Sequence, residues 1–232
     1  ATESLPKQIA RQIRQAIVDG RLRADDRLPG EEELAKRYGV SRPTIREALK
    51  RLAAQNLIRS RRGPAGGTFV KRPSQEELRE ALATTAMLGV GLGEFDLPDV
   101  AQARRELELV CCRLAAQRPD PAQLAVMEEE LHSQAWGNLS DEAFCASDVR
   151  FHRALVDAGN NRILQLLMVT VIEALQPAMN MAVFRFRERD VVVDQHRRLL
   201  AALKDGEADS ACGVLSEQMD YLAEGFAAAQ AG

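Results

Sequence analysis

Two short helical patterns lie close together in residues 31–55 and are separated only by the turn Tyr-Gly-Val-Ser at residues 38–41. The first pattern begins with three glutamates, which suit the positive end of a helix dipole, and Gly39 is suited to end it. Ser41 is a favourable N-cap for the second pattern, whose first turn contains Pro43. Two helices joined by so tight a turn predict a helix-turn-helix.

The flanking segments predict a winged form of this motif. Residues 5–18 repeat apolar side chains at helical spacing, and Gly20 ends that pattern. Residues 57–62 and 68–71 have strand character on either side of a glycine-rich loop, which indicates a β-hairpin. We therefore predict a winged helix-turn-helix domain, with three helices and a β-hairpin, over residues 4–72.

The remainder of the chain has helical patterns interrupted by turn signals and no convincing strand. Side chains suited to cap helix N-termini stand at Asp96, Asp120, Ser140 and Asn161. The helix that begins at Asn161 is expected to be long and to be kinked at Pro177. After a linker at residues 73–75, we predict an all-α bundle of six or seven helices over residues 76–228, so the fold class is mainly α.

The net charge of −3 conceals an uneven distribution. Residues 1–72 contain 17 Lys and Arg against 8 Asp and Glu, a net charge of +9. Residues 73–232 contain 14 against 26, a net charge of −12. A basic module fused to an acidic one indicates a polyanionic partner for the first part only, although charge alone does not exclude an accidental surface distribution.

Several classes of protein are excluded by simpler features. No stretch of eighteen apolar residues is free of polar interruption, so no transmembrane span is expected. The first residues have no apolar signal core, and we expect a cytoplasmic protein. The four cysteines form no Cys-x-x-Cys pair and fall in apolar helical patterns, which favours buried structural thiols over disulfides.

The predicted third helix has the pattern of a DNA recognition helix. Its apolar face consists of Ile45, Ala48, Leu49 and Leu52. On the other side, Arg42 and Arg46 are suited to read guanine in the major groove. Phosphate contacts are expected from Ser41, Thr44 and Lys50. A single arginine is usually only a solvated surface charge, but several together on one face of this motif favour DNA binding.

The hairpin has its own DNA-binding features. Arg61 and Arg62 immediately precede the glycine-rich tip. This arrangement suits a wing that lies along the DNA backbone or in the minor groove.

A possible metal site lies in the second part of the chain. Asp148 and His152 are four residues apart, so they lie about 40° apart on one helix face and can share a ligand. His196 belongs to another predicted helix, and helices in a bundle often bring such side chains together. One carboxylate and two imidazoles suit zinc, nickel or a similar ion. We assign His132, in a segment rich in Glu and Gln, to an ordinary core or surface histidine.

Residues 28–35 and 40–49 together resemble the signature of the GntR family of bacterial transcription regulators. Two positions depart from that signature: Gly30 replaces a serine, and Glu32 replaces an arginine that contacts DNA in the family. The positions that match include Arg42, Thr44, Arg46, Gly66 and Gly67. The resemblance covers residues 5–71 and adds Gly66 to the candidate DNA-binding residues.

The second part resembles the FCD effector domain of the FadR subfamily. The similarity is strongest at residues 103–116, 148–160 and 195–208. It implies a homodimer whose effector domain binds a small carboxylate together with a divalent metal such as zinc, nickel or manganese. The family supplies a further histidine where this chain has Gln218, a weaker ligand, and the first conserved helix implies Arg104 as a second anchor for the carboxylate.

These observations predict a transcription regulator, specifically a repressor, that binds a pseudo-palindromic double-stranded operator and senses a small organic acid. One alternative is an enzyme with Asp148, His152 and His196 as a catalytic metal site, but it lacks a nucleophile motif and leaves residues 1–72 without a purpose. The other alternative is an architectural DNA-binding protein without an effector. It leaves polar, metal-capable side chains in a helical core unexplained.

Overall fold

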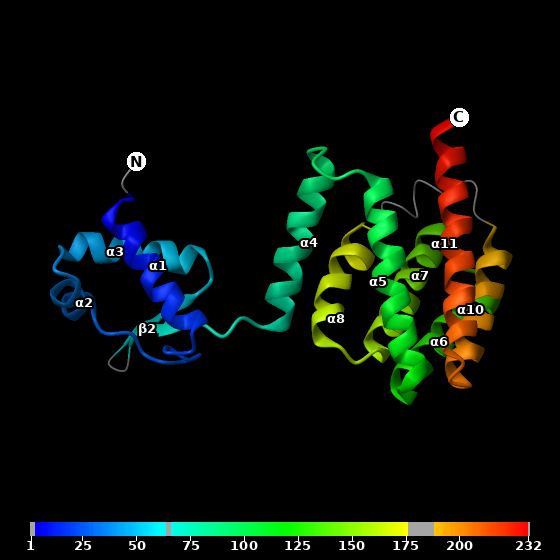
Figure 1. The fold of residues 1–232 in the computed structure, drawn as a ribbon, viewed down its shortest axis with the longest axis horizontal. Coiled ribbons are helices and arrows are strands. Elements are labelled where there is room, and N and C mark those ends of the chain that lie inside the picture. Colours follow the sequence, from blue (N-terminus) through cyan, green and yellow to red (C-terminus); the bar gives the residue numbers. More distant parts are fainter. Residues whose placement is uncertain (1–2, 64–65, 176–187, 232) are drawn as a thin grey trace. The chain divides into compact units, whose positions relative to one another are not determined.

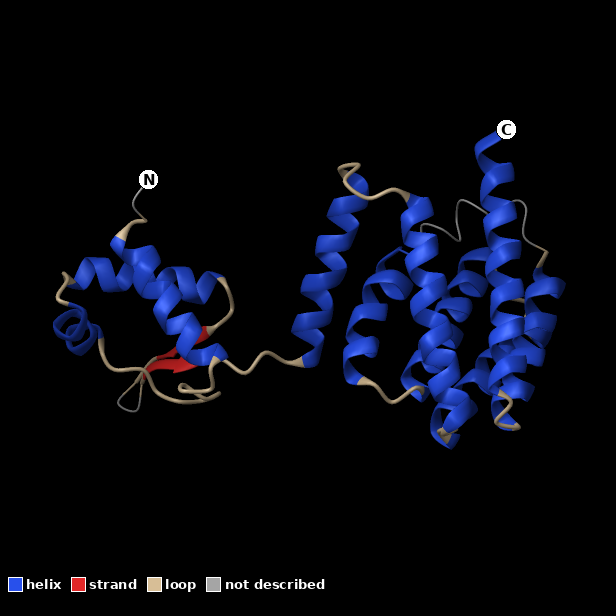
Figure 2. Ribbon diagram, in the orientation of Figure 1, coloured by secondary structure: helices blue, strands red, loops and turns tan. Residues whose placement is uncertain are grey.

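The computed structural model describes residues 3–63, 66–175 and 188–231. The chain divides into two compact units, residues 1–74 and 75–232. Helices are the main secondary structure of both units, and the described strands belong to the first (Figures 1 and 2). Among the residues described, no helix is both long enough and apolar enough to cross a membrane.

The first unit is a winged helix-turn-helix, as predicted. Its elements are α1 (Leu5–Val18), α2 (Glu31–Tyr38), α3 (Arg42–Ala54), β1 (Ile58–Arg61) and β2 (Gly67–Val70). The two strands pair antiparallel, with Ile58 opposite Val70 and Arg61 opposite Gly67. Apolar side chains from all three helices and both strands form one core.

The local signals between α2 and α3 act as the sequence indicates. Gly39 ends α2 with a φ of 63°, a left-handed conformation that a residue without a Cβ adopts at little cost. The Ser41 hydroxyl accepts a hydrogen bond from the Thr44 backbone N–H at 3.3 Å and so caps α3. A cap of this kind stabilises a helix by about 1 kcal/mol.

One feature of this unit is not indicated by the sequence pattern. Part of the polar segment at residues 21–28 pairs with β2. The backbone N–H of Leu28 donates to the carbonyl of Thr68 at 2.8 Å, and that of Val70 donates to the carbonyl of Asp26 at 2.9 Å. The pairing partner is far away in the sequence, and local periodicity carries no information about it.

The second unit is a helical bundle, as predicted. Its α-helices are α4 (Gln75–Gly91), α5 (Leu97–Gln117), α6 (Pro121–Trp136), α7 (Asp141–Ala158), α8 (Arg162–Val169), α10 (Arg189–Lys204) and α11 (Ala208–Ala231). The predicted caps are present, because the side chains of Asp96, Asp120, Ser140 and Asn161 each accept a backbone N–H at the start of a helix.

The helix predicted to begin at Asn161 is present, but it changes from α to π geometry within the described residues. The α-helix ends at Val169, and the described chain continues as a π-helix, η1 (Thr170–Leu175). Val171 packs in a cluster with residues of α4 and α5, whereas Ile172 packs with Met168. A π-turn has more residues per turn than an α-helix, and it changes the direction in which side chains leave the axis. Pro177 lies outside the described residues.

The bundle places polar side chains inside an apolar core. Helices α5, α6, α7, α10 and α11 run beside one another around this core (Figure 1). Three cysteines, Cys111, Cys112 and Cys212, are buried, and Cys145 is half-buried. The buried polar and charged side chains include Arg104, Glu108, Gln134, Ser147, Asp148, His152, Gln195, His196 and Gln218.

Candidate functional site

Three of these polar side chains converge in the core of the second unit. Asp148 and His152 lie one turn apart on α7, and His196 comes from α10. Oδ1 of Asp148 is 3.8 Å from Nε2 of His152 and 3.4 Å from Nε2 of His196. Ligand atoms of all three lie within 4.8 Å of one another. A buried carboxylate and two imidazoles at this spacing form a donor set for a divalent transition-metal ion.

The other ring nitrogen of each histidine faces an oxygen atom. Nδ1 of His152 contacts Oε1 of Glu108 on α5, and Nδ1 of His196 lies 2.7 Å from Oε1 of Gln134 on α6. In a neutral imidazole, a hydrogen on Nδ1 leaves the lone pair on Nε2. Both Nε2 atoms therefore present lone pairs next to the Asp148 carboxylate, an arrangement of acceptors that favours a cation.

Gln218 on α11 joins the cluster through His196. Its Nε2 lies 2.9 Å from Nε2 of His196, so the amide N–H donates to that lone pair. Oε1 of Gln218 and Nε2 of His152 are buried and have no hydrogen-bond partner among the residues described. Burying acceptors without partners is costly, and a bound cation would relieve that cost for His152. The donor set therefore fits a metal ion, with Gln218 as its weakest member.

Arg104 and Glu108 form a buried ion pair beside the cluster. Nε of Arg104 lies 3.0 Å from Oε2 of Glu108, and both side chains are almost fully buried. Burial opposes ionisation of Glu108, but His152 and the Arg104 guanidinium outweigh it and hold the pKa of Glu108 below its usual value. Nη2 of Arg104 has no hydrogen-bond partner in the described part of the chain. An unsatisfied guanidinium nitrogen in a core suits an anionic ligand.

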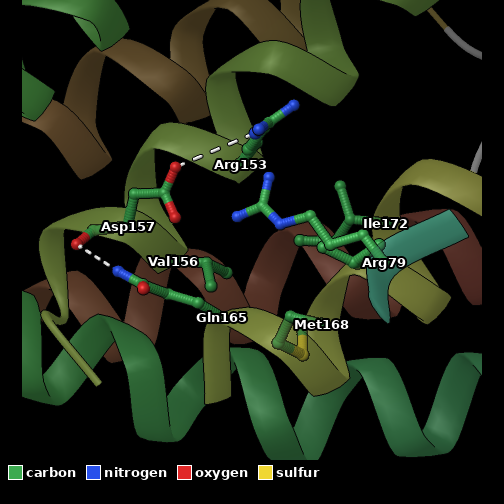
Figure 3. A pocket seen from close by; sticks show the side chains of 8 residues that line it. Arg79, Arg153, Val156, Asp157, Gln165, Met168 and Ile172 are labelled. Atoms are coloured by element: carbon green, nitrogen blue, oxygen red, sulfur yellow. Dashed lines mark hydrogen bonds and ion pairs between the residues drawn. The ribbon is translucent and has the colours of Figure 1, made fainter. Parts of the chain in front are cut away.

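A separate small pocket lies between α4, α7, α8 and η1 (Figure 3). The figure shows Arg79 of α4 beside the ion pair that Arg153 forms with Asp157 on α7. Burial raises the pKa of Asp157, and the charges of Arg153 and Arg79 oppose that rise. The cavity has a volume of about 10 Å³, which is room for one water molecule and not for a metabolite.

Of the residues predicted to bind DNA on α3, Arg42, Thr44 and Arg46 lie in its first half and Lys50 lies in its second half. Arg42, Arg46 and Lys50 are exposed, whereas Thr44 is half-buried. The hydroxyls of Ser41 and Thr44 are 2.8 Å apart, so they are partly engaged with each other.

The Arg46 guanidinium forms a two-point ion pair with Glu31 of α2 through one of its edges. Its Nε and Nη2 atoms lie 3.3 and 2.8 Å from the two carboxylate oxygens. The hydrogen bond from Arg46 lowers the pKa of Glu31. A paired guanidinium is held in one orientation, and base recognition requires such a fixed orientation.

The wing presents two further cations. Arg61 and Arg62 are exposed, and the Arg61 guanidinium lies 5.3 Å from the centre of the Phe69 ring. Gly66 donates its N–H to the carbonyl of Gly63 at 2.8 Å. A Cβ at Gly66 would lie 2.6 Å from two backbone oxygens, so no side chain fits there.

Two residues of the buried cluster are not evident from the sequence. Glu108 follows Arg104 by four residues, a spacing that usually marks a solvated surface pair. Both fall on the apolar stripe that also contains Cys111, Cys112 and Ala115, and that position is the signal that both are buried. Gln134 has a comparable signal, because it continues the apolar spacing of Leu124, Met127 and Leu131 on α6. His132 is exposed, with its ring 4.8 Å from that of Trp136.

Both units match known families. Residues 5–70 match the family described as bacterial regulatory proteins, gntR family, and residues 99–220 match the FCD domain. A structure titled Streptococcus agalactiae GntR superposes with a TM-score of 0.58 at 20% sequence identity, covering 93% of this chain and 97% of that one. At that identity the likeness shows a shared fold.

Curated relatives resemble this chain over most of its length. An uncharacterized HTH-type transcriptional regulator, YcbG of Bacillus subtilis (strain 168), is 29% identical and covers 95% of this chain and 89% of its own length. The putative L-lactate dehydrogenase operon regulatory protein of Escherichia coli (strain K12) is also 29% identical, and the match covers 94% of this chain and 84% of that protein. The galactonate operon transcriptional repressor of the same strain is 29% identical, and the match covers 84% of this chain and 85% of that protein.

Fold and family matches together define a two-domain transcription regulator with an FCD effector domain. The chain belongs to the GntR family of bacterial regulatory proteins. The alternative of a metal-dependent enzyme at Asp148, His152 and His196 is not retained, because the family and the relatives are transcription regulators.

Proposed function

We propose that this protein is a cytoplasmic repressor whose affinity for its operator is modulated by a small carboxylate bound in the helical bundle. The observation that carries the proposal is a buried polar cluster, with an unsatisfied Arg104 nitrogen, in a domain joined to a basic winged helix. Buried polar groups are costly, and a ligand that satisfies them stabilises the fold. The name of the galactonate operon repressor, a relative of this chain, supports repression.

We propose Asp148, His152 and His196 as the ligands of one divalent metal, with Gln218 as a weak fourth. The metal would supply positive charge and open coordination positions. Without it, the Arg104 cation and the carboxylates of Glu108 and Asp148 leave the core with one excess negative charge. A divalent cation reverses that sign, and one carboxylate then restores neutrality. This charge balance supports an acid as the effector.

Arg104 is the proposed second anchor for the acid. Its Nε is already paired with Glu108, which leaves Nη2 to donate to a carboxylate oxygen. The proposed class of effector is a small hydroxy or sugar acid. That class is supported by relatives named for lactate dehydrogenase and galactonate operons.

DNA contacts are proposed for the residues of α3 and of the wing described above. Arg42 and Arg46 would read bases, Ser41, Thr44 and Lys50 would hold phosphates, and Arg61, Arg62 and the Gly66 backbone would contact DNA from the wing. We propose a homodimer, since one small winged helix rarely binds tightly alone and two present matching surfaces to an inverted repeat.

Selection of bound duplexes from a random DNA library tests the regulator function and requires no candidate operator sequence. We expect the full-length chain to enrich an inverted repeat, and a truncation after Lys71 to be largely monomeric in sedimentation and to bind the same DNA far more weakly. Recovery of unenriched sequences by the full-length chain would contradict operator recognition. A full-length monomer on the selected DNA would contradict the dimer.

A further inference from the structure

We propose that hydrogen bonds from Glu130 through Ser147 and Gln134 fix His196 in the tautomer that carries no hydrogen on Nε2. Gln134 is then a positioning residue for the metal site, and this consequence rests on the proposed function. The tautomer itself is a property of the metal-free protein.

The hydrogen-bonded chain is continuous from the surface to the core. The Gln134 amide nitrogen donates to Oγ of Ser147 at 3.0 Å, and that hydroxyl donates to Oε2 of Glu130 at 2.7 Å. Glu130 is held in turn by Arg150, whose Nη2 lies 2.9 Å from the same oxygen. Gln134, Ser147 and His196 are buried, whereas Arg150 is exposed.

The donors and acceptors allow one direction for this chain. A carboxylate paired with arginine only accepts, so the single hydroxyl hydrogen of Ser147 goes to Glu130. Ser147 can then only accept from Gln134, which turns the amide nitrogen toward Ser147 and the amide oxygen toward His196. That oxygen lies 2.7 Å from Nδ1 of His196, and Nδ1 must carry the hydrogen. The reverse tautomer would set two acceptors against each other in the core, a costly arrangement.

His152 reaches the same tautomer by a shorter route. Its Nδ1 faces the carboxylate of Glu108 directly. Both imidazoles therefore turn Nε2 toward Asp148, but a neutral amide supports one and a charged carboxylate the other. Partners of this kind set ligand orientation, and losing one typically lowers metal affinity by about 10- to 100-fold.

The experiment is nitrogen NMR of the metal-free, full-length protein labelled with ¹⁵N-histidine. The chain contains three histidines, and exposed His132 provides an internal reference for an unconstrained ring. We expect His152 and His196 each to show a hydrogen on Nδ1 and none on Nε2, and His132 to show a mixture of tautomers. A hydrogen on Nε2 of His196 in the wild-type protein overturns the proposal.

Two variants test the role of Gln134. Gln134→Leu removes the oxygen, so His196 should switch to the tautomer with hydrogen on Nε2. That hydrogen can be donated to Asp148, or to the Gln218 amide oxygen once that amide turns over. Gln134→Glu keeps an oxygen facing Nδ1 and should keep the wild-type tautomer of His196, with the Ser147 hydroxyl turning from Glu130 to the new carboxylate. A Leu variant that retains the wild-type tautomer overturns the role of Gln134. Should that variant fail to fold, Ser147→Ala replaces it: we expect tautomer mixing at His196, and an unchanged spectrum overturns the hydrogen-bonded chain.

Zinc titration of the same proteins separates this inference from the proposed metal site. Gln134→Leu should bind zinc about 10- to 100-fold more weakly than Gln134→Glu. Equal zinc affinity of these two variants overturns the positioning role. The expected tautomers in a wild-type protein that binds no zinc would support the hydrogen-bonded chain and contradict the metal site. Zinc binding by a wild-type protein with the reverse tautomer would support the metal site and contradict the hydrogen-bonded chain.

Discussion

The amide nitrogen of Gln218 lies 2.9 Å from Nε2 of His196, so an amide hydrogen occupies the lone pair that a metal ion would use. A cation has to displace that hydrogen bond before His196 can coordinate it. In the proposed metal site, glutamine stands where the family resemblance implies a histidine, and this is unfavourable in two ways. It removes a strong ligand, and it supplies a competitor for one that remains.

Replacing Gln218 by histidine should tighten metal binding. Gln218→His removes the competing donor and provides an imidazole, and we expect zinc affinity to rise by roughly 10- to 100-fold, measured by competition with a chelating dye. Glu217→His is the matched control, because the neighbouring side chain is exposed and paired with Arg198. Equal zinc affinity of the Gln218→His variant and the wild type would contradict Gln218 as the weak position.

Removing the buried Arg104 guanidinium should strongly destabilise the bundle. Arg104→Leu leaves the Glu108 charge in the core without its cation, and the expected loss of unfolding free energy is about 3–5 kcal/mol, measured by urea denaturation. Arg198→Leu breaks an exposed pair with Glu217 and should cost at most about 1 kcal/mol. Similar losses for the two variants would indicate that Arg104 is not a buried charge partner.

Arg46→Ala should weaken operator binding by about 1–3 kcal/mol and relax sequence preference at the bases that it reads. Arg51→Ala, in the last turn of the same helix, is the control for loss of a positive charge. We expect Glu31→Gln to reduce discrimination between operator and random DNA, because the neutral amide releases Arg46 from its paired orientation. Unchanged operator affinity after Arg46→Ala would show that α3 is not the recognition helix.

Arg61→Ala in the wing should act differently. A phosphate contact contributes to binding of every sequence, so affinity for operator and random DNA should fall together. The slope of log affinity against log salt should become shallower by about 1. Loss of operator affinity alone, with an unchanged slope, would argue for base reading by the wing.

Local chemistry explains why so much of the fold was predictable. Ser41, Asp96, Ser140 and Asn161 each cap a helix through their own side chains, so their meaning is contained in a few neighbouring residues. The π-helix that follows Val169 and the pairing of Leu28 with Thr68 depend on distant partners. Periodicity does not encode such partners, and neither feature could be predicted from it.

In the candidate site, too, some residues could be predicted from local spacing and others depend on packing between helices. Spacing alone placed Asp148 and His152 on one face of α7, and the bundle brings His196 to them. Which polar groups support them is decided by packing. Glu108 and Gln134 lie on the apolar stripes of their helices, which indicates burial, but only the arrangement of α5 and α6 around α7 and α10 brings them to the imidazoles.

The most direct test of the whole account is operator affinity measured with zinc-loaded protein against a panel of small hydroxy and sugar acids. We expect at least one acid to change that affinity by about 5- to 150-fold. We expect His152→Ala to abolish this response while ligand-free operator binding stays near that of the wild type. A panel without effect, or a response that persists in His152→Ala, would contradict an effector site built on the buried cluster.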